Sequence, residues 1–255
     1  MASGQRIAML IDGDNAQASL LDEMLAEASK YGVVTIRRVY GDWTEPEMKG
    51  WKSALHTHAF QPIQQFRYTV GKNATDSAMI IDAMDILYTA GVDGFCLVSS
   101  DSDYTRLATR IREKNLFVMG IGKGNTPRAF VNACDVFVYT ENLEAASERK
   151  AESARTGAQS AGSGAAGNAE LPAFYPLFRT AFEVVAKGNG WAHLGSLGNK
   201  LRQLDPGFDP RTYGYRQLLT LIRSHPALFE IRRPKKKQQS GGSSPVYVRL
   251  VERGR

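Results

Sequence analysis

The chain has 255 residues, of which 43% are hydrophobic and 23% charged, a composition typical of a globular protein rather than a disordered one. This length fits one large domain or two ordinary ones. No stretch approaches the roughly 18 apolar residues of a membrane helix. The N-terminal residues lack the basic segment and long apolar run of a signal peptide, so we expect a cytoplasmic protein without a membrane partner.

The charge is distributed unevenly along the chain, whose formal net charge is +6. Residues 1–143 carry 14 Lys and Arg and 17 Asp and Glu, a net charge of −3. Residues 144–255 carry 18 and 9 of these residues, a net charge of +9. An acidic half joined to a basic half predicts an acidic site that takes a metal ion and a basic module that binds a polyanion.

Residues 5–142 have the pattern of alternating strands and helices. The first run, residues 6–11, is short and apolar, as suits a buried parallel strand. Residues 16–30 then place apolar side chains at helical spacing. Continuing in chain order, we expect strands at 33–39, 63–70, 94–99 and 116–121, and helices at 46–58, 79–90 and 104–114. This alternation predicts an α/β fold with a parallel sheet covered by helices on both faces.

The composition changes after residue 143. The stretch AQSAGSGAAGNAE within residues 144–170 is rich in Ala, Gly and Ser and has no apolar periodicity, which predicts a flexible linker. We expect residues 171–255 to form a small second domain with helices at 171–187, 193–204 and 209–224 and strands at 228–232 and 246–251. In the third helix Asp209 would be the N-cap and Pro210 would lie in the first turn. Three helices and a basic hairpin are the layout of a winged helix-turn-helix.

Three acidic clusters lie where predicted strands give way to helices. They read IDGDN at 11–15, TDS at 75–77 and SSDSD at 99–103. In an open α/β sheet the carboxyl ends of the strands line one crevice, and ligands bind there. We therefore expect carboxylates from the separate segments to converge in that crevice, namely those of Asp12, Asp76, Asp101 and Asp103.

Gathered carboxylates repel one another, and a divalent cation relieves the repulsion. Mg²⁺ in particular prefers a few carboxylates together with water molecules. Helix capping is the simpler interpretation of several of these residues, which are favoured at N-caps: Asp14, Asn15, Asp76, Ser102 and Asp103. Capping does not explain Asp12, which ends a strand, or the convergence of acids from three segments, so the clusters predict a metal site.

Helical phase indicates which acidic side chains face the crevice. Asp76 lies on the same side of its helix as Met79, which must face the sheet. Asp82 falls on the other side, and we interpret it as a supporting residue. Asn15 is expected to orient a carboxylate or a phosphate by hydrogen bonding, and Asp14 is a further supporting acid.

Nucleotide-cofactor motifs are missing from the sequence. The Gly-rich segment GIGKGN at 120–125 could cradle a phosphate with backbone N–H groups, but it does not fit GxGxxG and lies late in the chain. We expect a plain turn there. Cys96 and Cys134 lie in apolar, strand-like surroundings and are expected to be buried core residues in a reducing compartment.

The N-terminal residues match a known family in several motifs, in order and spacing: MLIDGDN at 9–15, NATDSAMIIDAMD at 73–85, CLVSSDSDYTRLATRIRE at 96–113 and ACDVFVYTENL at 133–143. This part resembles the NYN domains of the PIN-like nuclease superfamily, specifically the bacterial group related to LabA. The resemblance implies a PIN-like sheet and metal-dependent RNA cleavage by the acidic cluster, here Asp12, Asp76, Asp101 and Asp103. Ser100 departs from the family pattern, in which Gly is common at this position.

Residues 171–251 resemble the OST-HTH (LOTUS) domain, a winged-helix module that binds RNA. The resemblance implies that RNA is the partner of this chain. Tyr213 and Tyr215 could stack on unpaired bases, although we expect core packing for at least one of them. The candidates for RNA contact are basic or polar residues beside the crevice, on the third helix and in the presumed wing: Lys72, Asn73, Lys123, Arg128, Arg211, Arg216, Arg223, Arg232, Arg233, Lys235, Lys236 and Lys237.

The hypothesis that follows is hydrolysis of RNA phosphodiesters by Mg²⁺ or Mn²⁺ held on the four aspartates. Two alternatives stay open. The Asp12-Gly13-Asp14 segment also resembles the start of haloacid-dehalogenase phosphatases, in which the first Asp is phosphorylated and Asp101 and Asp103 would hold Mg²⁺. The chain could also be an RNA-binding regulator with an idle metal site. The sequence leaves the oligomeric state open, a homodimer included.

Overall fold

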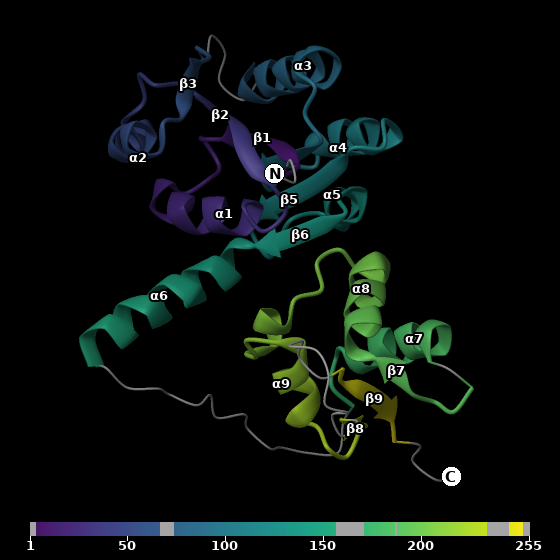
Figure 1. Cartoon of the computed structure of the whole chain (residues 1–255). Coiled ribbons are helices and arrows are strands. Elements are labelled where there is room, and N and C mark those ends of the chain that lie inside the picture. Colours follow the sequence, from purple (N-terminus) through teal and green to yellow (C-terminus); the bar gives the residue numbers. More distant parts are fainter. Residues whose placement is uncertain (1–3, 67–73, 157–170, 187, 234–244, 252–255) are drawn as a thin grey trace. The chain divides into compact units, whose positions relative to one another are not determined.

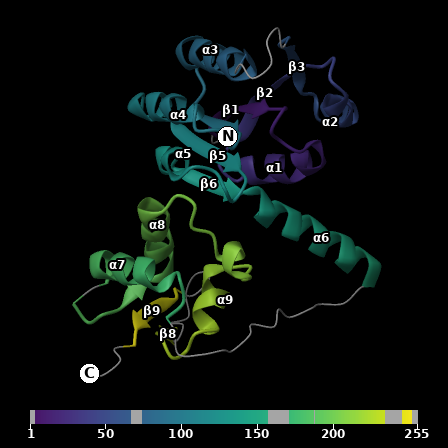
Figure 2. The ribbon, with the colours of Figure 1, turned by 180° about the vertical axis from the view of Figure 1, so that it is seen from behind.

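The chain forms two compact units, Met1–Gly157 and Ala158–Arg255 (Figures 1 and 2). The computed structural model describes residues 4–66, 74–156, 171–186, 188–233 and 245–251. Among these residues no helix has both the length and the apolar character needed to span a bilayer.

The first unit is built on a six-stranded parallel sheet of order β3-β2-β1-β4-β5-β6. Its strands are β1 (Arg6–Asp12), β2 (Val33–Gly41), β3 (Gln61–Gln64), β4 (Gly94–Val98), β5 (Phe117–Gly122) and β6 (Val136–Tyr139). The chain builds outward from β1 to β3 in one direction and then returns to place β4 to β6 on the other side of β1. The point where the order reverses lies between β1 and β4, and this is where ligands of open α/β sheets bind.

Helices cover both faces of this sheet (Figure 1). In the described part of this unit the helices are η1 (Ala18–Leu20), α1 (Leu21–Ala28), η2 (Pro46–Gly50), α2 (Trp51–His58), α3 (Ala74–Thr89), α4 (Tyr104–Glu113), α5 (Arg128–Ala133) and α6 (Thr140–Thr156). Helix α6 extends away from the sheet (Figures 1 and 2). One apolar core packs α1 and α2 against the sheet, and the other packs α3, α4 and α5. Successive residues of β1 alternate between the two cores, with Met9 in one and Leu10 in the other. The α/β architecture is therefore the one predicted, and Cys96 and Cys134 are buried as expected.

The sheet has one strand more than the five that we predicted. β6 is only four residues long, VFVY, and it lies directly between α5 and α6. A run this short has no periodicity that separates a strand from the end of a helix. The predicted strand 63–70 is also shorter than expected, since β3 spans Gln61–Gln64. Residues 67–70 lie outside the described part of the chain.

The linker prediction is wrong for its first part. Helix α6 spans Thr140–Thr156 and so includes residues 144–156, which we expected to be coil. Its sequence, TENLEAASERKAESART, is rich in Ala, Glu, Arg and Lys, all strong helix formers. The Gly residues on which the linker prediction rested begin only at Gly157, and residues 157–170 lie outside the described part.

The second unit contains helices and a small antiparallel sheet of order β7-β9-β8. In chain order its elements are α7 (Tyr175–Val185), β7 (Ala192–His193), α8 (Leu194–Leu204), η3 (Pro210–Tyr213), α9 (Leu218–Arg223), β8 (Phe229–Arg232) and β9 (Tyr247–Leu250). Its core is apolar and contains the fully buried Phe178, Leu197 and Val248. Strand β7 was not predicted, because two residues carry no pattern of their own.

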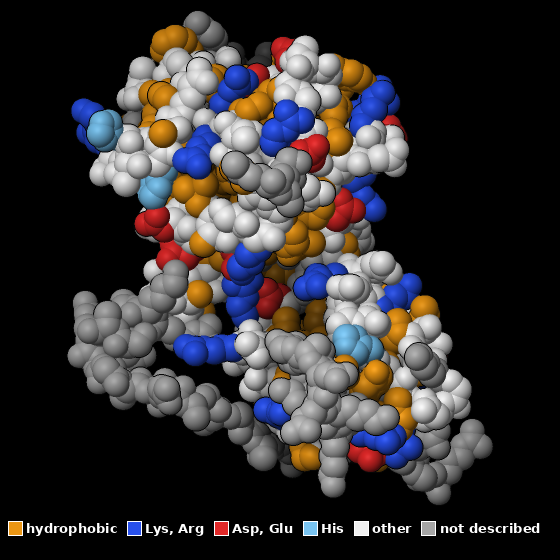
Figure 3. Space-filling view, viewed as in Figure 1, with side chains coloured by type: hydrophobic (Ala, Val, Ile, Leu, Met, Phe, Trp, Pro, Cys, Tyr) orange, Lys and Arg blue, Asp and Glu red, His pale blue; other side chains and the backbone are white. Residues whose placement is uncertain are grey.

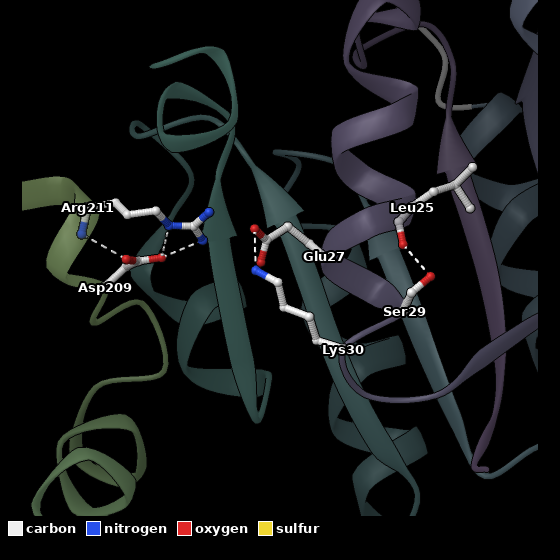
Figure 4. Close-up of polar contacts among 6 residues, drawn as sticks. All are labelled: Leu25, Glu27, Ser29, Lys30, Asp209 and Arg211. Atoms are coloured by element: carbon white, nitrogen blue, oxygen red, sulfur yellow. Dashed lines mark hydrogen bonds and ion pairs between the residues drawn. The ribbon is translucent and has the colours of Figure 1, made fainter. Parts of the chain in front are cut away.

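The third predicted helix of this unit, 209–224, is broken into two parts. Asp209 caps the first part as predicted, since its Oδ1 accepts a hydrogen bond of 2.8 Å from the backbone N–H of Arg211 (Figure 4). That part, η3, stops at Gly214, which has a φ of 81° in the left-handed region. Glycine adopts this conformation at little cost, so the chain turns there before α9 begins.

Candidate functional site

Asp12 lies at the carboxyl end of β1, beside the point where the strand order reverses. Its side chain is fully buried. Asp12 Oδ2 accepts hydrogen bonds from the side-chain amide of Asn15 at 2.7 Å and from the hydroxyl of Ser99 at 3.0 Å. Asp12 Oδ1 is buried without a hydrogen-bond partner among the described residues. A buried carboxylate oxygen left unpaired is costly, and a bound cation would satisfy it.

The electrostatic environment of Asp12 opposes its charge. The pKa of Asp12 is raised to about 6, chiefly by burial; the hydrogen bonds from Asn15 and Ser99 oppose the rise, and the neighbouring carboxylates of Asp76 and Asp14 add to it. The ionised form is therefore present at neutral pH in surroundings that favour the neutral one. A cation bound beside Asp12 would stabilise its ionised carboxylate, which the surrounding residues destabilise on balance.

Asp76 belongs to the first turn of α3 and is buried. Its Oδ1 accepts a hydrogen bond of 2.7 Å from the hydroxyl of the fully buried Tyr104, which begins α4. Burial raises the pKa of Asp76, the Tyr104 hydrogen bond lowers it, and the charges of Asp101, Asp103 and Asp14 raise it. The predicted orientation of Asp76 toward the other acids is thus the one found.

Asp101 and Asp103 follow β4 in the loop that leads into α4. Carboxylate oxygens of Asp76, Asp101 and Asp103 all lie within 4.8 Å of one another, close enough to share one metal ion. The backbone N–H of Asp103 donates to Asp101 Oδ1 at 2.9 Å. Asp103 holds the N-cap position of α4 but makes no side-chain capping bond, so capping does not account for its carboxylate.

Sequence reasoning missed two hydroxyl groups that hold these acids. Ser99 donates to Asp12 and in turn accepts a hydrogen bond of 3.1 Å from the backbone N–H of Asp101, so it links two of the clusters. Tyr104 supports Asp76 from another helix. The only signal in the sequence was the position of each polar group next to a buried apolar stretch, which does not identify the partner.

The supporting residues fall into two groups. Asn15 contacts Asp12, and Asp14 accepts a hydrogen bond of 2.9 Å from the hydroxyl of Thr75, next to Asp76, so both belong to the acidic site. Asp82 belongs elsewhere, because its carboxylate pairs with the Arg38 guanidinium and accepts from the Tyr40 hydroxyl. Asp82 therefore connects α3 to β2 and does not reach the acidic cluster.

Of the basic candidates of the first unit, Lys123 lies in the loop after β5 and Arg128 begins α5. Lys123 and Arg128 are both exposed. The backbone N–H of Lys123 donates to the hydroxyl of Ser100 at 2.8 Å, so this loop is fixed to the loop that carries Asp101. Lys72 and Asn73 lie outside the described residues.

The basic candidates of the second unit are mostly exposed, and Figure 3 shows Lys and Arg side chains on the surfaces of both units. Arg211 is the exception, because its guanidinium forms a 2.6 Å ion pair with the largely buried carboxylate of Asp209 (Figure 4). The exposed ones are Arg216, Arg223, Arg232 and Arg233. The remaining candidates, Lys235, Lys236 and Lys237, lie outside the described residues.

The two tyrosines proposed for base stacking pack against aromatic neighbours. The ring of Tyr213 meets Phe174 edge-on at 5.3 Å between centroids, and the ring of Tyr215 meets His225 at 5.8 Å. Tyr213 keeps 36% of its surface exposed. Core packing is thus the role that the structure assigns to Tyr215, while Tyr213 retains an open edge.

Comparison with known proteins gives two family matches. The NYN domain model matches residues 6–144, and the OST-HTH/LOTUS domain model matches residues 176–240. No curated protein matches the chain. A crystal structure of a protein of unknown function from Vibrio parahaemolyticus is similar at 20% identity and a TM-score of 0.46, over 55% of this chain and 94% of that one. A solution structure of an uncharacterized protein from Nitrosomonas europaea is similar at 30% identity and a TM-score of 0.29, over 38% of this chain and 92% of that one.

Proposed function

This chain belongs to the NYN domain family and carries an OST-HTH/LOTUS domain, and we propose that it is a ribonuclease that hydrolyses RNA phosphodiesters with Mg²⁺ or Mn²⁺. The NYN domain provides a nuclease-like fold, and OST-HTH domains bind RNA. The observation that carries the proposal is the convergence of Asp76, Asp101 and Asp103. Asp12 lies outside this group of three, but its charge interacts with that of Asp76, and its buried Oδ1 has no hydrogen-bond partner among the described residues.

The donor set fits a hard divalent cation. All four side chains offer carboxylate oxygens, the ligand type that Mg²⁺ and Mn²⁺ prefer. When bound, such a cation supplies Lewis acidity to a phosphoryl oxygen and makes water a stronger nucleophile at neutral pH. The candidate ligands are the aspartates that the sequence predicts: Asp12, Asp76, Asp101 and Asp103.

The residues around the acids contribute by positioning them. Asn15 and Ser99 fix Asp12 Oδ2, while Oδ1 has no hydrogen-bond partner among the described residues. Tyr104 fixes Asp76 in the same way. Because these partners are already in place, little reorganisation is needed when charge develops on the phosphate during the reaction.

The second unit supplies RNA affinity in this proposal. Its exposed arginines can neutralise phosphates and release counterions, a contribution that does not depend on the RNA sequence. Arg216 and Arg223 lie just before and within α9, while Arg232 and Arg233 lie at and after the end of β8. The acidic first unit would then act on RNA that the basic unit has bound.

The burial of Asp12 argues against the phosphatase alternative. A nucleophilic carboxylate must contact the phosphorus atom of a whole substrate, whereas a metal ligand needs to be reached only by a small cation, and Asp12 is fully buried. The remaining alternative is an RNA-binding regulator without turnover, and it differs from the proposal only in activity.

Incubating the full chain with a mixture of labelled RNAs in Mg²⁺, Mn²⁺ or EDTA tests the proposal. We expect products with either cation and none in EDTA. The Asp101→Asn variant is the control for a contaminating nuclease, and it should leave the RNA intact. RNA that binds but stays uncut in both metals would favour the regulator.

A further inference from the structure

A groove of about 620 Å³ opens beside the carboxyl ends of β2 and β3, and we call it the α2 groove because helix α2 forms one wall. Its lining combines aromatic and apolar side chains with basic ones. The residues that carry the inference are Trp43, Met48, Lys49, Lys52 and His56.

We propose that the α2 groove binds an unpaired nucleotide of the RNA substrate, with the base against Trp43 and the backbone phosphates beside Lys49 and Lys52. The proposal rests on the proposed ribonuclease function, because it assigns to the acidic site a single-stranded substrate. Proteins that bind single strands combine an aromatic stacking surface with a basic groove that follows the backbone, and the α2 groove offers both.

Two hydrogen bonds fix the position of Trp43, so its ring is preorganised for stacking on a base. Its indole Nε1 donates to the carbonyl of Ile63 at 3.0 Å, and its backbone N–H donates to the side chain of Gln64 at 3.0 Å. The ring is only half-buried, so part of it remains open to the groove. An aromatic ring that is already ordered loses little entropy when a base stacks on it.

The basic side chains of the groove are available to a polyanion. Lys49, Lys52 and His56 are all exposed. Neither lysine forms an ion pair within the part of the chain that the structure describes. The two lysines bring positive charge to one wall of a unit whose residues 1–143 sum to −3. Because these lysines form no ion pair with an acidic residue of the described part of the chain, their positive charge is available to bind the phosphates of RNA.

The α2 groove adjoins the acidic site through Met48. A Cβ atom placed on Gly13, between Asp12 and Asp14, would lie 2.8 Å from Met48 Cε. A Cβ placed on Gly41 would lie 2.5 Å from the same atom and 3.2 Å from Asp14 Oδ1. Met48 therefore lines the groove on one side and touches the backbone of the acidic site on the other. Since neighbouring strands lie about 5 Å apart, one RNA strand can reach both places.

The test uses the full chain, with fluorescent oligouridine in EDTA so that binding is measured without cleavage. Trp43→Ala should weaken binding about tenfold, the usual effect of losing one stacked base, while Trp43→Phe should keep most of the affinity. On an abasic oligonucleotide of equal length Trp43→Ala should have no effect. Photocrosslinking with 4-thiouridine RNA should label Trp43.

The lysines provide a second, independent measurement, since they are exposed and their replacement leaves the core intact. Lys49→Ala/Lys52→Ala should weaken binding of both oligonucleotides and reduce the salt slope by about two. Lys30→Ala/Lys114→Ala is the control with the same change in charge, because neither lysine lines the groove: Lys30 pairs with Glu27, and Lys114 lies over the ring of Tyr88. Thermal melting of each variant confirms that it is folded.

The possible outcomes distinguish a failure of the groove assignment from a failure of the nuclease proposal. Unchanged RNA binding in Trp43→Ala and in Lys49→Ala/Lys52→Ala would overturn the groove assignment, and it would leave cleavage by the acidic site unaffected. Equal losses in Lys30→Ala/Lys114→Ala would also overturn it, because the effect would then be one of overall charge. Groove-dependent binding in a wild-type chain that cuts no RNA in Mg²⁺ or Mn²⁺ would overturn the nuclease proposal alone.

Discussion

The carboxylate of Asp12 is fully buried, and this burial is unfavourable for its charged form. Because burial and the carboxylates of Asp76 and Asp14 raise its pKa to about 6, the folded protein binds its proton more tightly than the unfolded chain does. The sign of the pH dependence follows: without metal, this residue makes the fold less stable as the pH rises from about 4 to about 6.

Asp12→Asn should remove that penalty. In EDTA at pH 7.5 we expect the variant to be more stable than the wild type by up to about 3 kcal/mol, the value of roughly two pKa units. The difference should shrink as the pH falls toward 4, where the wild-type carboxyl is protonated in the folded protein and about half protonated in the unfolded chain. Urea unfolding of both proteins at three pH values measures it, and a variant less stable at pH 7.5 would show that Asp12 is stabilising without metal.

Tyr104 should act on metal binding through Asp76. Tyr104→Phe removes the hydroxyl that holds Asp76 Oδ1 and leaves the ring in the core. Loss of a hydrogen bond to a metal-ligating side chain typically weakens metal binding by about tenfold or more. The midpoint of the Mn²⁺-dependent rise in melting temperature should therefore shift to higher Mn²⁺ concentration. An unchanged midpoint would show that Tyr104 has only a packing role.

At the residue scale the acids could be predicted, but their hydroxyl partners could not. The acidic residues stand in short motifs at predicted strand ends and helix starts, so local sequence is enough to place them. Ser99 and Asp12 are 87 residues apart, and Tyr104 and Asp76 are 28 apart. Which hydroxyl meets which carboxylate depends on the packing of whole elements, and no local pattern encodes it.

At the element scale the site depends on how closely the ends of β4 and β5 approach. A Cβ on Gly122 would lie 2.5 Å from the backbone carbonyl of Ser99, a contact that real Cβ atoms do not make. Gly122→Ala must therefore displace the end of β4, where Ser99 holds Asp12. We expect a loss of about 1–3 kcal/mol in unfolding free energy and a weaker Mn²⁺ response.

Gly188→Ala is the matched control, because a Cβ at Gly188 would meet nothing within 4 Å. This variant should melt within a degree or two of the wild type. Chemical unfolding and Mn²⁺ titration of the two variants, side by side, measure the effect. If Gly122→Ala behaved like Gly188→Ala, the end of β4 would have room to adjust and the site would tolerate the shift.

The elements themselves were predictable where their patterns were long. The buried strands of the first unit follow from short continuous apolar runs, and its amphipathic helices follow from apolar residues at a period of 3.6. β6 and β7 were missed because four and two residues carry no period. α6 was misread because Ala and Ser suit both helices and linkers, and the break at Gly214 was missed because one glycine can also be tolerated inside a helix.

At the scale of the whole molecule the first half of the chain is acidic and the second half is basic. We therefore propose that the first unit catalyses cleavage and that the second unit binds RNA. A chain ending at residue 157 should still cut short RNA, with a KM raised several-fold and a similar kcat. RNA binding by the full chain should weaken steeply between low and physiological salt, because phosphate contacts release counterions. Steady-state kinetics of both chains measure KM and kcat, and fluorescence anisotropy of the full chain measures the salt dependence. An unchanged KM would show that the main RNA-binding surface lies in the first unit.

Cleavage of one labelled RNA by the full chain and by its Asp12→Asn/Asp101→Asn variant, across a Mn²⁺ titration, tests the central claim most directly. The claim is that the aspartates at the switch between β1 and β4 form one metal-dependent catalytic site. We predict that the wild-type rate rises with Mn²⁺ and saturates, while the variant, equally folded by thermal melting, cuts at no Mn²⁺ concentration. A variant that cuts RNA with the Mn²⁺ dependence of the wild type would contradict the claim.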